Sequence, residues 1–403
     1  FPANRHRRGE SRHPMSPPEG PPAGRSRPGQ RHPVLPGLLL CLCILLTEAG
    51  HAAEEPVLNV FNWADYLGPD TIAGFERETG IRVNYDVYDS SELVDTRLLA
   101  GNTGYDVVFH AANYAARLIP IGIFRPLDAG LLPGLRNLDP RLRAVFERYD
   151  PGLRHGVPYT WGTTGFAYDS EKIRARMPDA PLDSADLVFR PEIVSRFADC
   201  GVSLLDSATD VLPMAMLYLG HDANSVLPAE LAEAERLLLA IRPYVRYFSN
   251  QRMLVDLPAG EVCIAMSWSG DYAVARERAR EAGITRTLGF DIPVEGTPAW
   301  FDGAYIPADA PHPGNAHRFL AWLLRPEVIA EVTNTVGYAN PNAAATPRVR
   351  EDLRLDPAIY PDERIMQRLR TPFVLEPTSE RLRSRAWSRV KAGIPPPVGE
   401  PSR

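Results

Sequence analysis

The sequence predicts an α/β fold with two domains. Residues 58–109 alternate between strand and helix, which is how a parallel sheet with helical crossovers begins. Residues 201–268 form a second unit of the same kind. About 350 residues remain after the first 52, a length that exceeds a single small core and favours two domains.

The opening unit has helices with clear ends. Its expected elements are an apolar strand from residue 58 to 63, a helix at 69–79, a strand at 81–87, a helix at 91–100 and a strand at 105–109. Pro69 starts the first helix, and Gly80 and Gly101 follow the two helices as stop signals. Because the carboxyl ends of parallel strands meet at one edge, the turn at 110–114 should lie beside Trp63.

The middle of the chain should connect the two domains. A helix is expected at 140–148, and the glycine-punctuated stretch at 157–168 predicts a strand that passes from one domain to the other. The second unit is expected as strand 201–205, helices 207–219 and 229–242, strand 245–248, helix 250–259 and strand 262–267. The end of the chain predicts a strand at 304–307 and helices at 312–324, 326–335, 361–369 and 376–391.

The first 52 residues have the composition of a secretory signal peptide. Seven Arg precede an apolar segment at 34–46 that is too short to span a membrane comfortably, and small residues follow up to Ala52. Met15 offers an internal start, in which case the segment before it is not translated. No later apolar stretch is long enough to cross a bilayer, so export predicts a periplasmic protein.

The charge of the remaining chain suits a cationic ligand. Beyond residue 52 there are 37 basic and 47 acidic residues, a net charge of about −10. A nucleic-acid-binding protein would instead present a basic face, so we expect no nucleic acid partner.

The sequence lacks the motifs of common catalytic and metal sites. We find no HExxH, no phosphate-binding GxxxxGK[ST], no GxGxxG after a strand and no GxSxG. The five histidines after residue 52 are scattered without metal-ligand spacing, and only His110 falls in the expected cleft. We therefore predict a binding protein that is not an enzyme and that carries no cofactor, no metal and no catalytic residue.

Aromatic and acidic residues occur together at three places that we expect at strand ends. These places are residues 63–66, 268–271 and 299–302, the last one before the strand at 304–307. An aromatic face and a carboxylate both favour positive charge, so the group predicts a cation site. Its members are Trp63, Asp65, Tyr66, Trp268, Asp271, Trp300 and Asp302, with Asp210 and Tyr338 as further candidates. The alternative is that the aromatics belong to the core and the acids start turns.

Magnitudes favour a ligand with more than one ammonium group. One charged hydrogen bond contributes about 1.5 to 3 kcal/mol and one cation-π contact about 0.5 to 2 kcal/mol, whereas association costs at least about 4 kcal/mol. Micromolar binding needs roughly 8 kcal/mol net. Several acids and rings must therefore act on two or more amines joined by an apolar chain.

Two cysteines, Cys200 and Cys263, lie beyond the leader. In an oxidising compartment an isolated pair forms a disulfide more often than a metal site, and closing this loop would contribute roughly 4 kcal/mol. The sequence alone does not place their Cα atoms within reach of each other.

Five segments together resemble the periplasmic polyamine-binding proteins of ATP-driven uptake systems, above all the putrescine-binding members. The segments are Asn-Trp-Ala-Asp-Tyr at 62–66, Phe-Glu-Arg-Glu-Thr-Gly-Ile at 75–81, Tyr-Asp-Val at 85–87, Trp-Ser-Gly-Asp at 268–271 and Tyr-Ala-Asn at 338–340. The resemblance extends over residues 56–392. It implies a type II periplasmic-binding fold, with two α/β lobes joined by crossing strands and a ligand cleft between them.

The resemblance also implies roles for individual residues. The family's ligand-contacting positions correspond to Trp63, Asp65, Tyr66, Asp210, Trp268, Asp271, Trp300, Asp302 and Tyr338. Asp271 and Asp302 match the pair that takes one terminal ammonium, and Asp65 and Asp210 match the other end, partly through water. Cys200 and Cys263 fall on the disulfide positions of the putrescine-binding members.

Several positions depart from the family pattern. Ala64 and Ala111 stand where serines commonly contact ligand, and His110 replaces a usual proline. Asp210 is one methylene shorter than the usual Glu, and Trp300 is closer to spermidine-preferring relatives. A lost hydroxyl costs around 1 kcal/mol if its hydrogen bond is not replaced.

We therefore predict that the mature chain captures a protonated polyamine, putrescine first and spermidine next, for an ABC permease and its ATPase. Lobe 1 is expected at 53–162 and about 290–342, lobe 2 at 163–289 and about 343–393, and a tail at 394–403. The protein should act as a monomer. The alternatives are a polyamine sensor that signals to a receptor and a related binding protein retargeted to another cationic amine.

Overall fold

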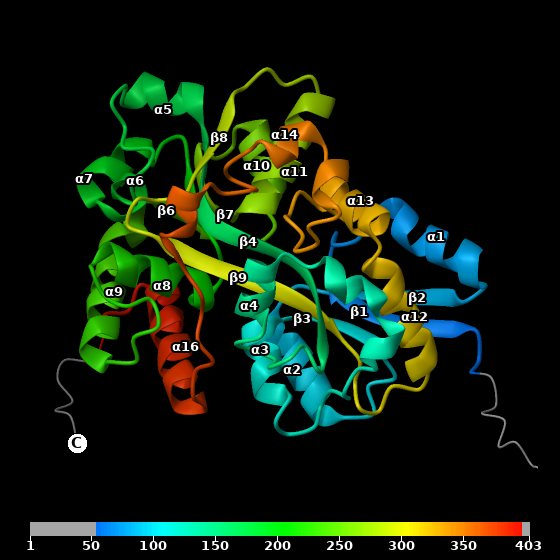
Figure 1. The fold of residues 1–403 in the computed structure, drawn as a ribbon. Helices are drawn as coiled ribbons and strands as arrows, with labels where there is room; N and C mark the ends of the chain where they lie inside the picture. Colours follow the sequence, from blue (N-terminus) through cyan, green and yellow to red (C-terminus); the bar gives the residue numbers. More distant parts are fainter. Residues whose placement is uncertain (1–53, 397–403) are drawn as a thin grey trace, which may run out of the picture. The chain divides into compact units, whose positions relative to one another are not determined.

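The computed structural model of the protein describes residues 54–396 (Figure 1). The predicted signal peptide at 1–52 and residues 397–403 of the predicted tail lie outside this part. Within it, no helix combines the length and the apolar character that a membrane span requires.

The opening unit forms three parallel strands, as predicted. β1 (Val57–Trp63) lies between β2 (Arg82–Tyr88) and β3 (Val107–Ala111) and pairs with both of them. The connections are α1 (Pro69–Thr79) and α2 (Ser91–Ala100), with the predicted bounds. Gly80 ends α1 in a left-handed conformation with φ of 71°, which glycine adopts without steric cost.

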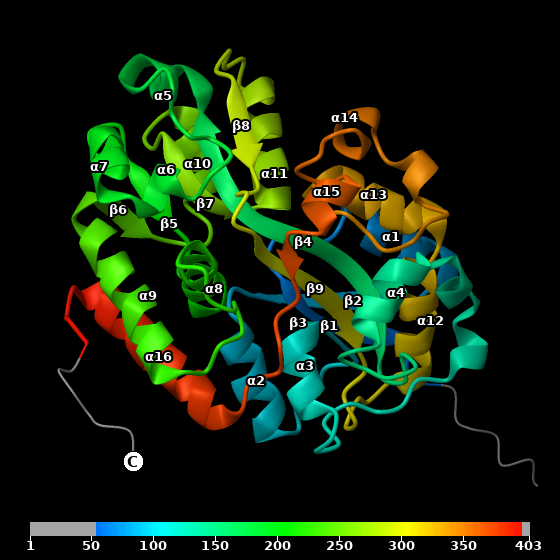
Figure 2. The same ribbon diagram turned by 60° about the vertical axis from the view of Figure 1, so that its left-hand side comes forward.

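Two long strands run through the middle of the sheet. β4 (Gly156–Asp169) is buried along all 14 residues and pairs antiparallel with β9 (Thr297–Tyr305) over its first half. Its second half pairs with β7 (Ile264–Trp268) and β8 (Leu288–Asp291). The strand order is β2-β1-β3-β9-β4-β7-β5-β6, and both views show β4 and β9 side by side (Figures 1 and 2). The predicted strand at 157–168 is therefore confirmed, and it takes part in both halves of the sheet.

The second unit is also confirmed. β5 (Val202–Leu204) pairs in parallel with β6 (Val245–Phe248) and with β7. Around these strands lie α8 (Ala208–Tyr218), α9 (Pro228–Ile241) and α16 (Pro377–Ala392), which pack together (Figure 2). α10 (Met253–Ala259) precedes β7, and α11 (Ser269–Glu281) follows it directly.

Shorter elements complete the described part. The other helices are α3 (Ala112–Leu118), α4 (Pro140–Phe146), α5 (Ser170–Arg176), α6 (Asp186–Phe189), α7 (Pro191–Val194), α12 (Pro313–Leu323), α13 (Pro326–Val336), α14 (Glu351–Arg354) and α15 (Glu363–Met366). The 3-10 turns are η1 (Ala129–Leu131), η2 (Pro133–Asn137), η3 (Ser195–Phe197), η4 (Arg242–Tyr244) and η5 (Thr346–Arg348), and a two-residue strand, β10 (Leu369–Arg370), pairs with β9.

The side chains of β1 and β3 alternate between two hydrophobic cores. Val60 and Phe109 enter the core beneath α1, α12 and α13, whereas Phe61 and Val108 face the core beneath α2 and α3. A separate core gathers β5, α8, α9 and α16 with the far end of β4. The sheet thus carries distinct cores along its length.

Cys200 and Cys263 form a disulfide, with their Cα atoms 5.5 Å apart. The bond ties the turn before β5 to the residue before β7. This confirms the pairing that the family resemblance implies.

Three local predictions are wrong, and one helix was not predicted. Residues 110–114 are not a turn, because β3 continues to Ala111 and α3 begins at once. The strand predicted at 304–307 begins seven residues earlier, so Trp300 and Asp302 lie inside β9 rather than before it. The helix predicted at 361–369 is only the four-residue α15, and α11 is absent from the sequence-based prediction.

Candidate functional site

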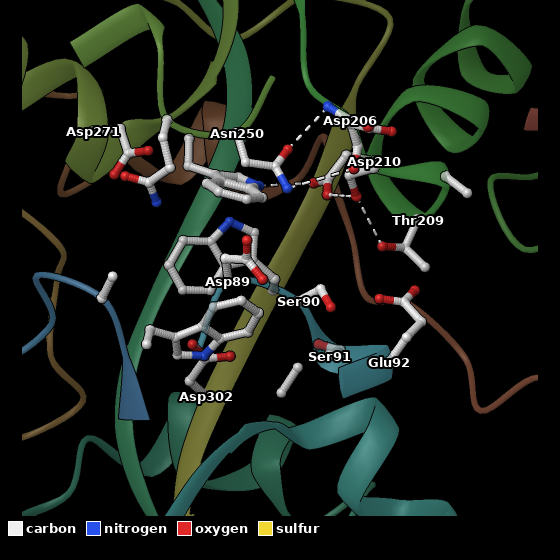
Figure 3. A pocket seen from close by; sticks show the side chains of 18 of the residues that line it. Asp89, Ser90, Ser91, Glu92, Asp206, Thr209, Asp210, Asn250, Asp271 and Asp302 are labelled. Atoms are coloured by element: carbon white, nitrogen blue, oxygen red, sulfur yellow. Dashed lines mark hydrogen bonds between the residues drawn. The ribbon is translucent and has the colours of Figure 1, made fainter. Parts of the chain in front are cut away.

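A cavity of about 550 Å³ opens where β1, β3, β7 and β9 approach α8, α11 and α16. Its lining combines indole and phenol rings with carboxylates. Figure 3 shows three of these carboxylates, with Asp271 and Asp210 on opposite sides of the view and Asp302 below them.

Asp302 on β9 is held by the hydroxyl of a tyrosine. Tyr66, in the loop after β1, donates a hydrogen bond of 2.8 Å to Oδ2 of Asp302, and its oxygen lies 2.5 Å from Oγ1 of Thr160. Asp302 is only 5% exposed. Burial raises the pKa of Asp302 to about 7, and the Asp210 carboxylate adds to the rise, while the Tyr66 hydrogen bond opposes it.

Asp271 has a parallel arrangement in the first turn of α11. The Tyr338 hydroxyl donates a hydrogen bond of 2.5 Å to its Oδ1. A helix N-terminus favours a carboxylate, yet burial is the larger effect and raises the pKa of Asp271 to about 7. The charge of Asp65 adds to this rise, and Arg278 acts against it.

Asp210 in the first turn of α8 accepts three hydrogen bonds. The donors are Thr164 Oγ1 and Ser207 Oγ, both at 2.5 Å, and the indole Nε1 of Trp268 at 3.2 Å. Burial raises the pKa of Asp210, whereas these donors lower it. Asp210 therefore fixes the orientation of Trp268 as well as supplying negative charge.

Asp65 is the most exposed of the predicted acids. It stands at φ of 54°, its side chain is 78% exposed, and its Oδ2 lies 3.9 Å from Nη2 of Arg278. Asp65 acts on Asp271 and Asp210 acts on Asp302, while Tyr338 is influenced by both Asp271 and Asp302. Asp271 and Asp302 are thus linked through the contacting rings of Tyr338 and Tyr66.

Rings form much of the cavity wall. Trp300 packs edge-on against Tyr338 with centroids 4.9 Å apart, and Tyr338 packs edge-on against Tyr66 at 5.5 Å. The indole nitrogens of Trp63 and Trp300 are buried and find no hydrogen-bond partner among the described residues. These rings can cover an alkyl chain and face a cation.

The structure brings all nine main candidates to one cavity. Trp63, Asp65, Tyr66, Asp210, Trp268, Asp271, Trp300, Asp302 and Tyr338 all line it. Ala64 and Ala111 line it too, and Ala111 lies opposite Asp302 in the β3–β9 register.

The placement predicted for His110 is wrong. Its ring is fully buried on β3 and does not line the cavity. Because β3 continues to Ala111, His110 points toward α2, where its Nε2 lies 2.8 Å from Oδ1 of Asp95.

Sequence reasoning missed a polar outer part of the cavity. Asp89 and Glu92 near the start of α2 line it, as does Asp206 before α8 (Figure 3). Ser384 and Lys391 contribute from α16. The sequence signal for this part of the cavity was the start of the second helix directly after a strand. Residues 89–92 follow β2 and lie at the same sheet edge as Trp63.

No group of three or more His, Cys, Asp or Glu side chains within residues 54–396 is arranged to hold a metal ion.

The profile of the bacterial extracellular solute-binding protein family matches residues 70–359, well over half of the chain, and the chain belongs to this family. The chain is 45% identical over 358 residues to the putrescine-binding periplasmic protein SpuD of Pseudomonas aeruginosa, covering 88% of this chain and 98% of the relative. It is 42% identical over 361 residues to the putrescine-binding periplasmic protein PotF of Escherichia coli, covering 89% and 98%.

A solved structure agrees with these relatives. The spermidine/putrescine ABC transporter substrate-binding protein PotD of Streptococcus pneumoniae superposes with a TM-score of 0.70 at 26% identity, covering 84% of this chain and 99% of that chain. The predicted type II periplasmic-binding fold and the predicted family are confirmed. The relatives are named for solute binding and not for catalysis, in agreement with the prediction of a binding protein.

Proposed function

We propose that this protein captures a protonated polyamine outside the cytoplasm and delivers it to an ABC permease driven by an ATPase. The carrying observation is that Asp302, which is buried, and Asp271, which is half-buried, lie beside aromatic rings with their pKa values raised to about 7. Withdrawing two carboxylates from water without counter-charge is costly, and a dication would supply that charge.

The contacts of the acids suggest how a diamine binds. One ammonium would lie by Asp271 and Asp302, beside Tyr338 and Tyr66, and the other toward Asp210 and Asp65. The methylene chain would run between the rings of Trp300, Tyr338 and Trp63. Names of the relatives SpuD and PotF favour putrescine as the diamine.

Binding would be coupled to closure of two lobes. We place lobe 1 at 53–162 and about 290–342, and lobe 2 at 163–289 and about 343–393, with β4 and β9 as the crossing strands. Asp302 then belongs to lobe 1 and Asp271 to lobe 2, and a ligand that contacts both favours the closed form.

The delivery route rests on the family and on the leader. A signal peptide at 1–52 would export the chain as a periplasmic monomer. A strain that lacks the gene should lose uptake of labelled putrescine at low external concentration. Unchanged uptake together with altered gene expression would instead favour a sensing role.

Calorimetric titration tests the binding proposal. The mature protein is unfolded to remove bound ligand, refolded with its disulfide intact, and titrated with putrescine, cadaverine, spermidine, spermine and agmatine. We expect micromolar or tighter binding of at least one of them. An absence of heat with all five, with an unchanged melting temperature, would overturn the proposal.

Matched variants test the two acids. Asp302→Asn and Asp271→Asn should each weaken binding by about 10- to 100-fold, since each removes a charged hydrogen bond of about 1.5 to 3 kcal/mol. Asp179→Asn is the control, because Asp179 is exposed and lies outside the cavity lining. Equal affinities in all three variants would remove the assigned roles.

A further inference from the structure

An ion-pair network lies at the outer edge of the cavity, between α3 and α16. These helices belong to different hydrophobic cores, since Ala115 and Leu118 of α3 pack with β1 and Trp387 and Val390 of α16 pack with α8 and α9. Contacts between the two helices therefore join parts of the protein that have separate hydrophobic cores.

Arg117 of α3 stands at the centre of this network. Its Nη2 lies 2.6 Å from Oδ2 of Asp95 on α2, and its Nη1 contacts Oε2 of Glu380 on α16. Its guanidinium carbon lies 4.5 Å from the centroid of the Tyr114 ring. The three charged side chains are only 18 to 30% exposed, so solvent screens them less than a surface pair.

Without Arg117 the facing charges would repel each other. Glu380 faces Asp95 and Glu92, both carboxylates of α2, and burial with these charges raises the pKa of Glu380, while Arg117 lowers it. The His110 ring adds a further contact on Asp95 from β3. Arg117 is thus the cation through which α16 and α2 can approach each other.

The network is one helical turn from the cavity on both sides. Tyr114, three residues before Arg117, lines the cavity and donates a hydrogen bond of 3.2 Å to Oε1 of Glu92. Ser384, four residues after Glu380, lines it from α16. Residues three or four apart share one face of a helix, so the ion pair lies on the same faces of α3 and α16 as these cavity-lining residues.

We infer that Arg117 is a positioning residue, whose pairing with Glu380 holds α16 against α3 when the cavity encloses its ligand. The inference rests on the proposed function for its ligand. The pair joins α3 to α16 and does not contact the ligand. It therefore slows ligand release more than it changes ligand capture. Arg117 does not line the main cavity itself.

Affinity and release rate test the inference. Arg117→Ala and Glu380→Gln should weaken putrescine binding by about 10-fold, with most of the change in the dissociation rate, as measured by calorimetry and by stopped-flow tryptophan fluorescence. The charge-swapped double variant, Arg117→Glu with Glu380→Arg, should bind more tightly than Arg117→Glu alone. Equal affinity in Arg117→Ala, Glu380→Gln and the native chain would overturn the inference.

Arg143→Ala is the matched control. Arg143 lies in α4 and pairs at 3.0 Å with Glu147, the residue that follows this helix, and Arg143 is partly exposed. This pair does not connect separate hydrophobic cores. Its removal should therefore leave the affinity and the release rate unchanged. A similar effect in Arg143→Ala would mean that any lost ion pair weakens binding.

A second measurement does not depend on the ligand's identity. Spin labels are attached to cysteines introduced at Ile121, after α3, and Leu382, in α16, which are 63% and 42% exposed. We expect a population at the separation found in this structure, reduced by Arg117→Glu and restored by the charge swap. If no polyamine binds, the proposed function fails, but this experiment still decides the inference about Arg117. The inference is overturned if no labelled molecules show the separation found in this structure, or if Arg117→Glu leaves their fraction unchanged.

Discussion

The Tyr338 hydroxyl donates a 2.5 Å hydrogen bond to Oδ1 of Asp271, and Tyr66 makes the equivalent contact with Asp302. Each acid is thus oriented by a phenol from a different segment of the chain. Both acids nevertheless have raised pKa values, because burial outweighs one hydrogen bond. The ligand-free cavity therefore holds carboxylates that are close to half-protonated near neutral pH.

Polyamine affinity should fall as the pH drops below about 7. An ammonium binds the ionised carboxylate, and the pKa values of about 7 mean that Asp271 and Asp302 are mostly protonated at pH 5.5. Binding near pH 7 should also release about one proton in total, measured as the dependence of the calorimetric heat on the ionisation enthalpy of the buffer. Constant affinity from pH 5.5 to pH 8 would contradict the raised pKa values.

Asp302→Asn should stabilise the ligand-free protein at pH 8 while it weakens binding. The pKa of Asp302 is raised from 3.8 to about 7, so the unfolded chain ionises from about pH 4 upward while the folded protein keeps the carboxyl protonated, and stability is lost between about pH 4 and pH 7. We expect a gain of up to about 4 kcal/mol in the free energy of unfolding at pH 8. At about pH 3.5 Asp302 is mostly protonated in both the folded and the unfolded state, and the difference should nearly vanish. Urea unfolding at both pH values provides the comparison, and a variant less stable at pH 8 would argue against this account.

Gly270→Ala should weaken binding without touching a carboxylate. A Cβ at Gly270 would overlap the Tyr338 ring, so the ring must move and its hydrogen bond to Asp271 is disturbed. The strain should lower the free energy of unfolding by about 1 to 3 kcal/mol and reduce putrescine affinity by at least about 10-fold. Gly130→Ala is the control, since its Cβ would meet only Oδ1 of Asp128 at 3.1 Å. Calorimetric titration should show weaker putrescine binding in Gly270→Ala than in Gly130→Ala.

Ala111→Ser should tighten diamine binding by a few fold. Ala111 lines the cavity opposite Asp302, and a serine hydroxyl there can accept a hydrogen bond from an ammonium group, which contributes about 1 kcal/mol. Ala112→Ser is the control, because Ala112 is buried in a hydrophobic core. Titration of both variants with putrescine separates a new ligand contact from a general effect of a serine at this helix start.

Reduction of the disulfide between Cys200 and Cys263 should lower the free energy of unfolding by roughly 4 kcal/mol. The bond closes a loop with a sequence separation of 63, and the chain-entropy model assigns the loss to a less constrained unfolded chain. Urea unfolding with and without a reductant measures it. The Cys200→Ser and Cys263→Ser double variant should then be insensitive to the reductant.

The opening of the fold was predictable because its signals are local. Proline at the start of α1 and a glycine at its end determined both bounds from sequence. α11 escaped prediction because its buried face is built from small residues, such as Ala273, Ala275 and Ala279, so no apolar period is visible. The start of β9 was misplaced because Trp300, Asp302 and Gly303 resemble a loop in composition, although all three lie within the strand.

The cavity was predictable in its members and less so in its geometry. Strand ends and family motifs located the rings and acids, but sequence spacing says nothing of which acids share an electrostatic neighbourhood. His110 was misplaced because β3 continues two residues beyond its predicted end, so His110 lies within the strand and points to the opposite face of the sheet from Phe109 and Ala111. The need for Gly270 is also invisible in sequence, since it arises from Tyr338, 68 residues further along the chain.

The buried strand β4 implies a constraint on how this chain can diverge. Its first half registers with β9 and its second half with β7, so inserting or deleting one residue between Gly162 and Thr164 would turn the side chains of one half to the wrong face. Substitutions can be absorbed at single positions of the strand, whereas a change in its length would disrupt both halves together. In natural variants of this protein, insertions and deletions should therefore spare residues 156–169.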